Sequence, residues 1–403
     1  MNTELLNEIN SLSLEVFKIY NRVIRTPLNW KDERERLEKN PNNRANFQYE
    51  EVNLKGLKKV LLLSKNQFLK ESKETKTTGY FEFLNDVVLA SVNNALMKIK
   101  IIGSLNKCPL KSLLKLRQDF YSLPFDYKRV ECQFEKIKND RNMVNIGKVL
   151  GKQQLSAEEA AEIIRKSLNK AVTKIDKVIK MPKQFKSDIL KTFTAQVEVV
   201  DDPSFSMRCI VDPKTSMTKI LLNKRRKYSR ELLKIAFLHE FCGHALEMTI
   251  FDGVFIKKGI LPKIFGYTGV SSPNIFDVKS EVFADLIVKP FLTKAEIPFV
   301  KFRREVWLIC RAMADYLYNI KGKTIADVMK IYETVGLSDF AFDEAIMAAI
   351  FVDGYQGMYL FANEEIEKLA KGKPFGKEFL TKLLLIGKIP YRNLNGFSFS
   401  IVK

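Results

Sequence analysis

The sequence lacks several features that would place it in a membrane or in an oxidising compartment. Its five cysteines are odd in number, scattered and without a C-x-x-C pair, so they indicate neither a zinc ribbon nor a disulfide framework. The first residues, MNTELLNEINSL, have neither the basic start nor the apolar core of a signal peptide. No apolar stretch approaches the length of a membrane-spanning helix. We therefore expect a cytoplasmic protein with reduced thiols and no transmembrane segment.

The composition is that of a folded protein with an excess of positive charge. The 403 residues are 46% hydrophobic and 11% aromatic, which suits a large core in one or two domains. The formal net charge of +20 favours an anionic partner, such as an acidic polypeptide, an acidic membrane surface or, less favoured here, nucleic acid. Because the lysines are spread over the whole chain without a basic tail, they are equally well explained as a solvated surface.

Apolar periodicity predicts a mainly helical chain with one small sheet. Helical patterns dominate residues 1–125, which carry no recognisable chemistry, and a capping box at Ser156–Glu159 opens a further helix. Short Val- and Ile-rich segments separated by Asp-Pro turns follow at 196–200, 207–211 and 219–223. They predict an antiparallel sheet that leads directly into a helix at 231–250. The expected fold class is α+β and mainly helical, with a zincin-like active-site helix beside a small antiparallel sheet.

The two histidines of the chain, His239 and His244, lie in this helix and enclose Glu240. Neutral imidazole is the commonest zinc ligand, and a glutamate beside a ligating histidine is the usual general base of a metallopeptidase. With both imidazoles on a metal, none remains for a serine-type catalytic triad. The pattern H-E-x-x-x-H therefore predicts a zinc site, against the alternative of two buried histidines that each bond a carbonyl.

The spacing of the two histidines differs from that of the familiar zinc helix. Histidines at i and i+4 lie about 40° apart around a helix, whereas those at i and i+5 lie about 140° apart, too far to share one ion easily. One extra residue taken up as a π-bulge would return both rings to one face. Gly243, which has no Cβ, would ease that distortion.

A zinc peptidase also needs a third protein ligand and an open position for water. Glu281, on the next predicted helix at 276–287, is the best candidate, with the small residue Ala284 three positions on. Asp285 lies one turn further along the same face and could accept a hydrogen bond from a ligating histidine. Between the two helices, Gly253–Pro273 is predicted to be a long loop.

Several segments in a fixed order carry a resemblance to a known family. The most specific are the metal motif His239–His244 and the third-ligand segment Ser280–Ala284. Weaker likenesses run almost from end to end, at Asn29–Leu37, Asn46–Tyr49, Lys98–Ser122, Asp353–Gly357 and Leu385–Lys388. Together they resemble the family of animal and bacterial proteins that includes the microtubule-associated tyrosine carboxypeptidases. The resemblance implies a zinc metallopeptidase with carboxypeptidase activity.

The chain departs from that family's pattern at three places. Cys242-Gly243 stands where the family usually has Gly-Thr, and Ser280 precedes Glu281 where the family has a double acid. The stretch Met347–Phe351 is apolar where the family carries an arginine. These changes leave the metal residues intact but alter the substrate pocket, so tubulin is not carried over as the substrate.

We expect a zinc-dependent metallopeptidase, a carboxypeptidase that removes a C-terminal residue from a peptide or protein tail. One Zn²⁺ per chain would be held by His239, His244 and Glu281. Glu240 would take a proton from the zinc-bound water and deliver it to the leaving amine. Tyr355, expected in a loop, could stabilise the oxyanion, and Arg208 or a nearby lysine could hold the terminal carboxylate of the substrate.

Other interpretations fit the same residues. H-E-x-x-G-H also resembles the motif of dipeptidyl-peptidase III, so an aminopeptidase or dipeptidyl-peptidase is an alternative, although the double acid of that family's second motif is missing. A second alternative is a basic binding protein with a structural metal, closed by Cys242 as a fourth protein ligand. A metal other than zinc also fits the ligand set. The catalytic domain is expected to span residues 126–403, either after a separate helical region at 1–125 or as one continuous unit with it.

Overall fold

Helices account for most of the chain, as the apolar periodicity predicts. The computed structural model describes residues 3–25, 27–74, 80–104, 110–152, 154–201, 205–211, 217–259, 277–370 and 376–386. The three predicted strands form one small sheet beside the histidine helix. The expected class, α+β and mainly helical, is confirmed.

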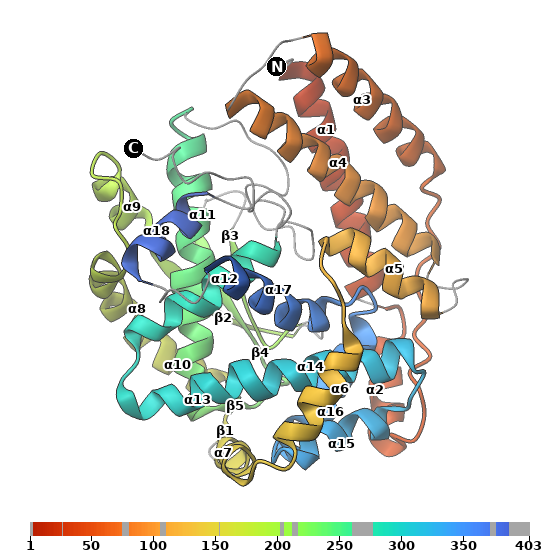
Figure 1. The fold of residues 1–403 in the computed structure, drawn as a ribbon, viewed down its shortest axis with the longest axis vertical. Coiled ribbons are helices and arrows are strands. Elements are labelled where there is room, and N and C mark those ends of the chain that lie inside the picture. The colour runs from red at the N-terminus through yellow and green to blue at the C-terminus, as the bar shows by residue number, and fades with distance from the viewer. Residues whose placement is uncertain are drawn as a thin grey trace.

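The N-terminal helices form a layer along one side of the molecule (Figure 1). They are α1 (Thr3–Tyr20), the π-helical turn η1 (Asn21–Arg25), α2 (Trp30–Lys39), α3 (Lys55–Glu74), α4 (Tyr80–Ser104) and α5 (Leu110–Tyr121). α1 buries Ile9, Val16 and Tyr20 and packs against α3 and α4. At the end of α1 the Tyr20 hydroxyl donates to the Asp353 carboxylate at 2.5 Å, which ties this layer to the C-terminal half of the chain.

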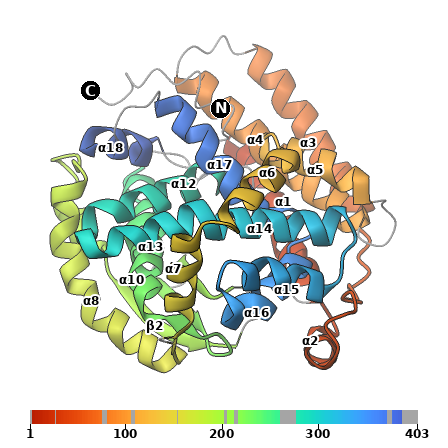
Figure 2. The same cartoon turned by 60° about the horizontal axis from the view of Figure 1, so that its bottom comes forward.

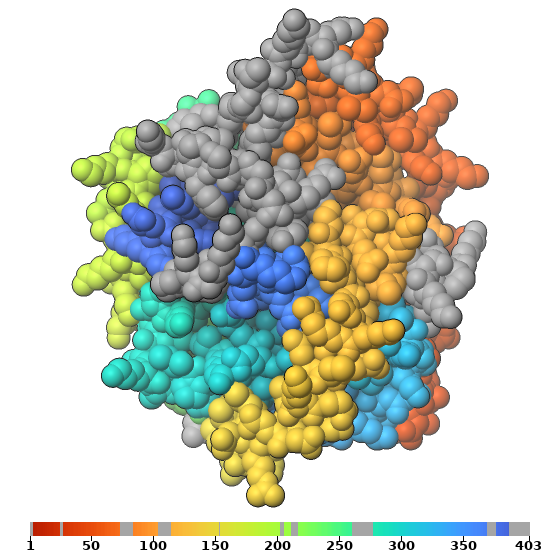
Figure 3. All heavy atoms as spheres, viewed as in Figure 1, coloured from red at the N-terminus to blue at the C-terminus, as the bar shows by residue number. Residues whose placement is uncertain are grey.

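The next helices lead from this layer to the sheet. α6 (Tyr127–Ile137) and α7 (Arg141–Lys152) run down one face of the molecule, as the space-filling view shows in yellow (Figure 3). α8 (Ala157–Val178) packs against β2 at the outer edge (Figure 2), and α9 (Lys186–Thr192) follows it. The predicted capping box is present, because Ser156 Oγ accepts from the Glu159 amide and Glu159 Oε2 accepts from the Ser156 amide.

The sheet has the strand order β2–β4–β3, formed by β2 (Ala195–Val200), β4 (Thr218–Asn223) and β3 (Met207–Val211). β3 and β4 are antiparallel, as expected, but β2 runs parallel to β4, so the sheet is mixed. Asn223, at the end of β4, holds the chain just before β3. Its backbone amide donates to Ser206 O and its side-chain amide donates to Phe205 O, each at 3.0 Å. Apolar alternation shows which face of a strand is buried but not the direction of its neighbour. A separate antiparallel pair joins β1 (Gln154–Leu155) to β5 (Tyr228–Ser229).

One long helix passes from the sheet into the core and consists of α10 (Arg230–Leu238), η2 (His239–Ala245), α11 (Leu246–Met248) and η3 (Thr249–Ile256). η2 and η3 are π-helical, so the predicted π-bulge between the histidines is confirmed. The helix extends to Ile256, with Ile250, Phe251 and Val254 buried, so the prediction of a loop from Gly253 was wrong there. The rest of that predicted loop, from residue 260 on, lies outside the described residues.

α12 (Asp277–Val288) packs on the histidine helix, and α17 (Tyr355–Ala370) packs on α12 near the centre of the molecule (Figure 1). The other elements are η4 (Lys289–Phe291), η5 (Lys294–Glu296), α13 (Ile297–Phe302), η6 (Arg303–Trp307), α14 (Leu308–Asp315), η7 (Tyr316–Ile320), α15 (Ile325–Thr334), α16 (Ser338–Ile350) and α18 (Lys377–Leu385). No single described helix is long and apolar enough to cross a membrane, and α16 and α17 pass that test only as a pair bent by 92°. The likeness at Leu385–Lys388 extends beyond the described residues.

Candidate metal centre

The π-helical turn η2 brings the two histidine rings together. His239 Nε2 and His244 Nε2 lie 3.2 Å apart, and the two rings meet edge to face with their centroids 4.9 Å apart. On a regular helix these side chains would diverge by about 140°, so the extra residue in the turn aligns them. His239 is buried and His244 is half-buried, which leaves the pair open on one side.

Gly243 sets the distance between this helix and α12. A Cβ at Gly243 would lie 2.4 Å from Ala284 Cβ and 2.6 Å from Ala284 Cα, well inside van der Waals contact. The two small residues therefore allow a close approach of the helices. Glu281 belongs to α12, whose residues are all buried, and lies one turn before Ala284. The close approach is a second role for Gly243, beyond the easing of the π-bulge that its missing Cβ predicts.

Three ligand atoms converge beside this contact. Glu281 Oε2 lies 3.1 Å from His239 Nε2 and 3.3 Å from His244 Nε2. The ligand atoms of these residues all lie within 4.8 Å of one another, and no other such group of His, Cys, Asp or Glu is found among the described residues. The structure thus brings together the three predicted metal ligands.

Asp285 lies where the sequence predicts a second contact to a histidine. Its Oδ1 accepts a hydrogen bond from His239 Nδ1 at 2.8 Å, which leaves Nε2 facing Glu281. Arg303 forms an ion pair with the same Asp285 carboxylate. Burial alone lowers the pKa of His239, but the charge of Asp285 and the hydrogen bonds to Asp285 and Glu281 outweigh it and raise the pKa to about 9. The proton held there occupies the side of the ring that would face a metal.

The charge of this cluster suits a divalent cation. Burial alone raises the pKa of Glu281, yet the two histidines hold it well below its usual range. With neutral imidazoles, the carboxylates of Glu240, Glu281 and Asp285 outnumber the two nearby guanidiniums, Arg303 and Arg208, by one charge. A proton on His239, whose pKa is raised, or a bound cation would balance this buried negative charge. Two imidazoles and one carboxylate are a ligand set that catalytic zinc sites use.

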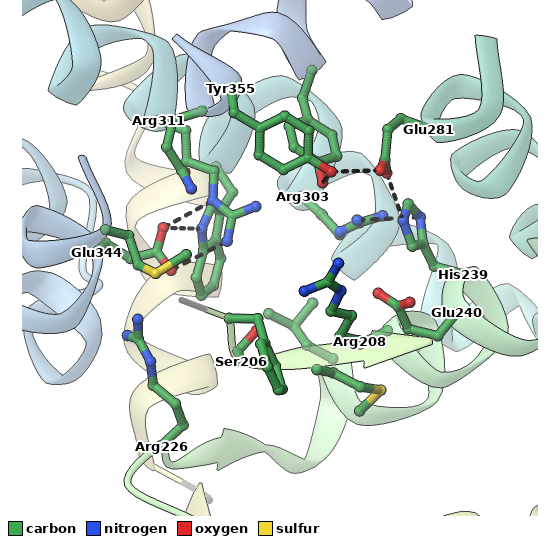
Figure 4. Close-up of a pocket in the computed structure, with 18 of the residues that line it drawn as sticks. Ser206, Arg208, Arg226, His239, Glu240, Glu281, Arg303, Arg311, Glu344 and Tyr355 are labelled. Carbon is green, nitrogen blue, oxygen red and sulfur yellow. Dashed lines mark hydrogen bonds and ion pairs between the residues drawn. The ribbon is translucent and has the colours of Figure 1, made fainter. Parts of the chain in front are cut away.

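Glu240 lies beside β3 with its carboxylate turned into a pocket (Figure 4). Its Oε2 accepts a hydrogen bond from the Cys209 amide at 2.8 Å, on the edge of the sheet. Burial raises the pKa of Glu240, and the charges of His244 and His239 oppose that shift. A carboxylate whose pKa is raised toward neutrality suits a general base. The bond to Cys209 was not predicted, and it uses a backbone amide of the edge strand β3.

The pocket in front of the histidines has a volume of about 250 Å³. Arg208 extends into it from β3 (Figure 4), and its guanidinium makes no hydrogen bond or ion pair with any described residue. The other arginines that line the pocket are paired with acids, as Arg303–Asp285, Arg311–Glu344 and Arg226–Asp343. Arg208 is therefore the arginine of the described pocket wall that is available to an anionic group.

Tyr355 reaches the site as the first residue of α17, so its predicted place in a loop was wrong. Its hydroxyl donates to Glu281 Oε1 at 2.7 Å and accepts from the Tyr359 hydroxyl at 3.0 Å. Arg117 holds the turn that precedes α17, because its guanidinium donates two hydrogen bonds to the Val352 carbonyl. The Arg117 side chain also packs against Gly354, whose φ of +81° favours glycine. In this arrangement Tyr355 orients a ligand carboxylate, and its role at an oxyanion stays a prediction.

Cys242 lies between the histidines in sequence but faces the hydrophobic core. Burial raises the pKa of its thiol. The described group of ligand atoms contains no cysteine. A structural metal closed by Cys242 therefore finds no support in the geometry.

Sequence reasoning missed several ionic residues around the site and its pocket. Lys279 and Glu247 form a fully buried ion pair near His244, and Arg226 lines the pocket. The available signal was a charged residue inside an apolar helical segment, as in DVKSEVFADLIV around Lys279. A charge can occupy such a segment only with a buried partner.

Comparisons with known proteins address the fold. No family model and no curated protein matches the sequence. The solved structure of a protein from Colwellia psychrerythraea, described as a “putative lipoprotein”, is similar over 98% of this chain and 76% of that chain, with 14% identity and a TM-score of 0.51. A “putative lipoprotein of unknown function” from Shewanella oneidensis is similar over 84% of this chain and 72% of that chain, with 14% identity and a TM-score of 0.46. At this identity the first likeness shows a shared fold alone.

Proposed function

We propose that the protein is a zinc-dependent metallopeptidase that acts as a carboxypeptidase on peptides or protein tails. The observation that supports this most is the convergence of His239 Nε2, His244 Nε2 and Glu281 Oε2 at the wall of the pocket that Glu240 also lines. Membership of the tyrosine carboxypeptidase family is part of the same proposal. It rests on the H-E-x-x-x-H residues and on the downstream glutamate that meets them.

The chain's own residues divide the chemical work among them. Bound zinc would lower the pKa of a coordinated water and polarise the scissile carbonyl. Glu240 accepts the proton of the attacking water and passes it to the leaving amine. The Cys209 amide holds the Glu240 carboxylate at the pocket wall, while Asp285 and Tyr355 orient His239 and Glu281.

Arg208 is the residue that favours a chain end over an internal peptide bond. A guanidinium can bind a terminal carboxylate through two parallel hydrogen bonds. Arg208 lies in the pocket beside Glu240 and is unpaired among the described residues. We therefore propose the C-terminus of a peptide or protein as the partner, and the net charge of +20 favours an acidic one. The described cysteines are free thiols, which fits action in the cytoplasm.

Metal analysis of the purified protein, followed by mass spectrometry of a peptide library, tests this proposal. We expect zinc in the protein and loss of single C-terminal residues from free peptides, but no cleavage of C-terminally amidated ones. Peptides acetylated at the N-terminus should be cleaved normally, whereas an aminopeptidase or dipeptidyl-peptidase would spare them. Glu240→Gln should slow cleavage strongly, while the matched control Glu231→Gln, in the same helix, should not. A library left intact by zinc-loaded wild type would refute the activity.

A further inference from the structure

A chain of buried polar side chains leads from His244 into the core. His244 Nδ1 lies 3.2 Å from Ser280 Oγ, and the Ser280 hydroxyl donates to Glu247 Oε2. Lys279 Nζ donates to the other oxygen of the Glu247 carboxylate. Lys279, Ser280 and Glu247 each expose at most 1% of their surface. None of these three residues takes part in a chemical step of the proposed reaction. Three buried polar side chains in one chain of hydrogen bonds therefore suggest a role beside the reaction itself.

Hydrogen-bond accounting fixes the direction of this chain. An ionised carboxylate can only accept, so the single hydroxyl proton of Ser280 points toward Glu247. Ser280 Oγ then offers His244 only lone pairs and must accept a proton that the ring carries on Nδ1. With the His244 proton on Nε2 instead, Ser280 would have to turn toward Nδ1 and leave a buried carboxylate oxygen without that donor, which is costly. Lys279 keeps Glu247 ionised, because a buried carboxylate without a cation loses its charge.

We propose that Glu247, acting through Ser280, is the positioning residue of His244. It holds the imidazole in the tautomer protonated on Nδ1 and so presents Nε2 as a metal ligand. Asp285 and Arg303 serve His239 in the same way, but there the carboxylate contacts the ring directly. That this hydrogen-bonded chain supports metal binding rests on the proposed function. The tautomer itself can be measured without metal.

Nitrogen NMR of the zinc-free protein labelled with ¹⁵N-histidine tests the tautomer. The chain has two histidines, so the spectrum contains two imidazoles, and His239→Gln assigns them. At a pH where the His244 ring is neutral, we expect its proton on Nδ1. Ser280→Ala, and independently Glu247→Gln, should shift the proton to Nε2, whereas Ser280→Thr, which keeps the hydroxyl, should not. A wild-type His244 protonated on Nε2, or a tautomer unchanged in Ser280→Ala and Glu247→Gln, overturns the proposal.

Zinc affinity, measured by competition with a coloured chelator, gives the second readout. Loss of the outer partner should weaken zinc binding about 10- to 100-fold in Ser280→Ala. Ser64→Ala is the matched control, because Ser64 is also a buried helical serine that donates to a glutamate, Glu8, at 3.2 Å. It should bind zinc as wild type does, as should Ser280→Thr. Equal zinc affinity in Ser280→Ala and Ser64→Ala would overturn the positioning role. If wild type took up no zinc, the proposed function would fail, and the tautomer measurement would still decide whether the chain positions His244.

Discussion

The contact between Gly243 and Ala284 offers a mutational test of how the metal centre is built. In Gly243→Ala the added Cβ would lie 2.4 Å from Ala284 Cβ, where carbon atoms keep about 3.5–4.0 Å. The two helices must therefore separate by about 1 Å, and α12 carries Glu281 with it. Metal sites tolerate deviations of only about 0.2 Å in ligand distance. We expect zinc affinity to fall about 100-fold and the free energy of unfolding to fall by about 1–3 kcal/mol from overpacking.

Gly253→Ala is the matched control, because it adds the same methyl group to the same long helix at an ordinary distance of 3.5 Å from Thr192 Cγ2. Chelator competition measures zinc affinity in both variants, and denaturant unfolding measures stability. Adding Ala284→Gly to Gly243→Ala removes the nearest atom but leaves the Ala284 Cα at 2.6 Å, so we expect partial recovery. Zinc affinity and stability in Gly243→Ala equal to those of Gly253→Ala would refute the reasoning.

Three further changes separate binding from chemistry. Glu240→Gln should keep zinc and lower kcat by about 100- to 10,000-fold, and near-normal turnover of the best library peptide would remove Glu240 from the mechanism. Arg208→Met should raise KM about tenfold or more for peptides with a free C-terminus without changing zinc affinity; an unchanged KM contradicts the role of Arg208. Because the pKa of His239 is raised to about 9, zinc must displace a proton, so apparent affinity should fall by up to about tenfold for each pH unit below that value. Chelator competition that gives a flat pH profile would contradict this.

The metal residues were predictable because their signal is chemical. A π-bulge brings histidines five residues apart onto one face of a helix, and the structure has that bulge at His239–Ala245. A peptidase site needs a third ligand from a neighbouring element, which pointed to Glu281. Asp285 followed from helical spacing, since it lies one turn beyond Glu281 on the same face. Each of these inferences uses only local geometry and ligand chemistry.

The features that were missed depend on partners distant in sequence. Lys279 and Glu247 are 32 residues apart, and nothing local to either one indicates the pair. The parallel direction of β2 depends on a connection that Asn223 holds across the sheet. Tyr355 was expected in a loop because Asp353-Gly354 interrupts the helical pattern. The interruption is short, because the chain turns at Gly354, which has a positive φ, and α17 starts at the next residue.

X-ray absorption at the zinc edge of the loaded protein tests the central claim most directly. The account predicts one zinc ion per chain, with nitrogen and oxygen ligands at about 2.0–2.1 Å and no sulfur shell. Failure to bind zinc, or a sulfur ligand at about 2.3 Å, would contradict a site made of His239, His244 and Glu281 with a position left open for water.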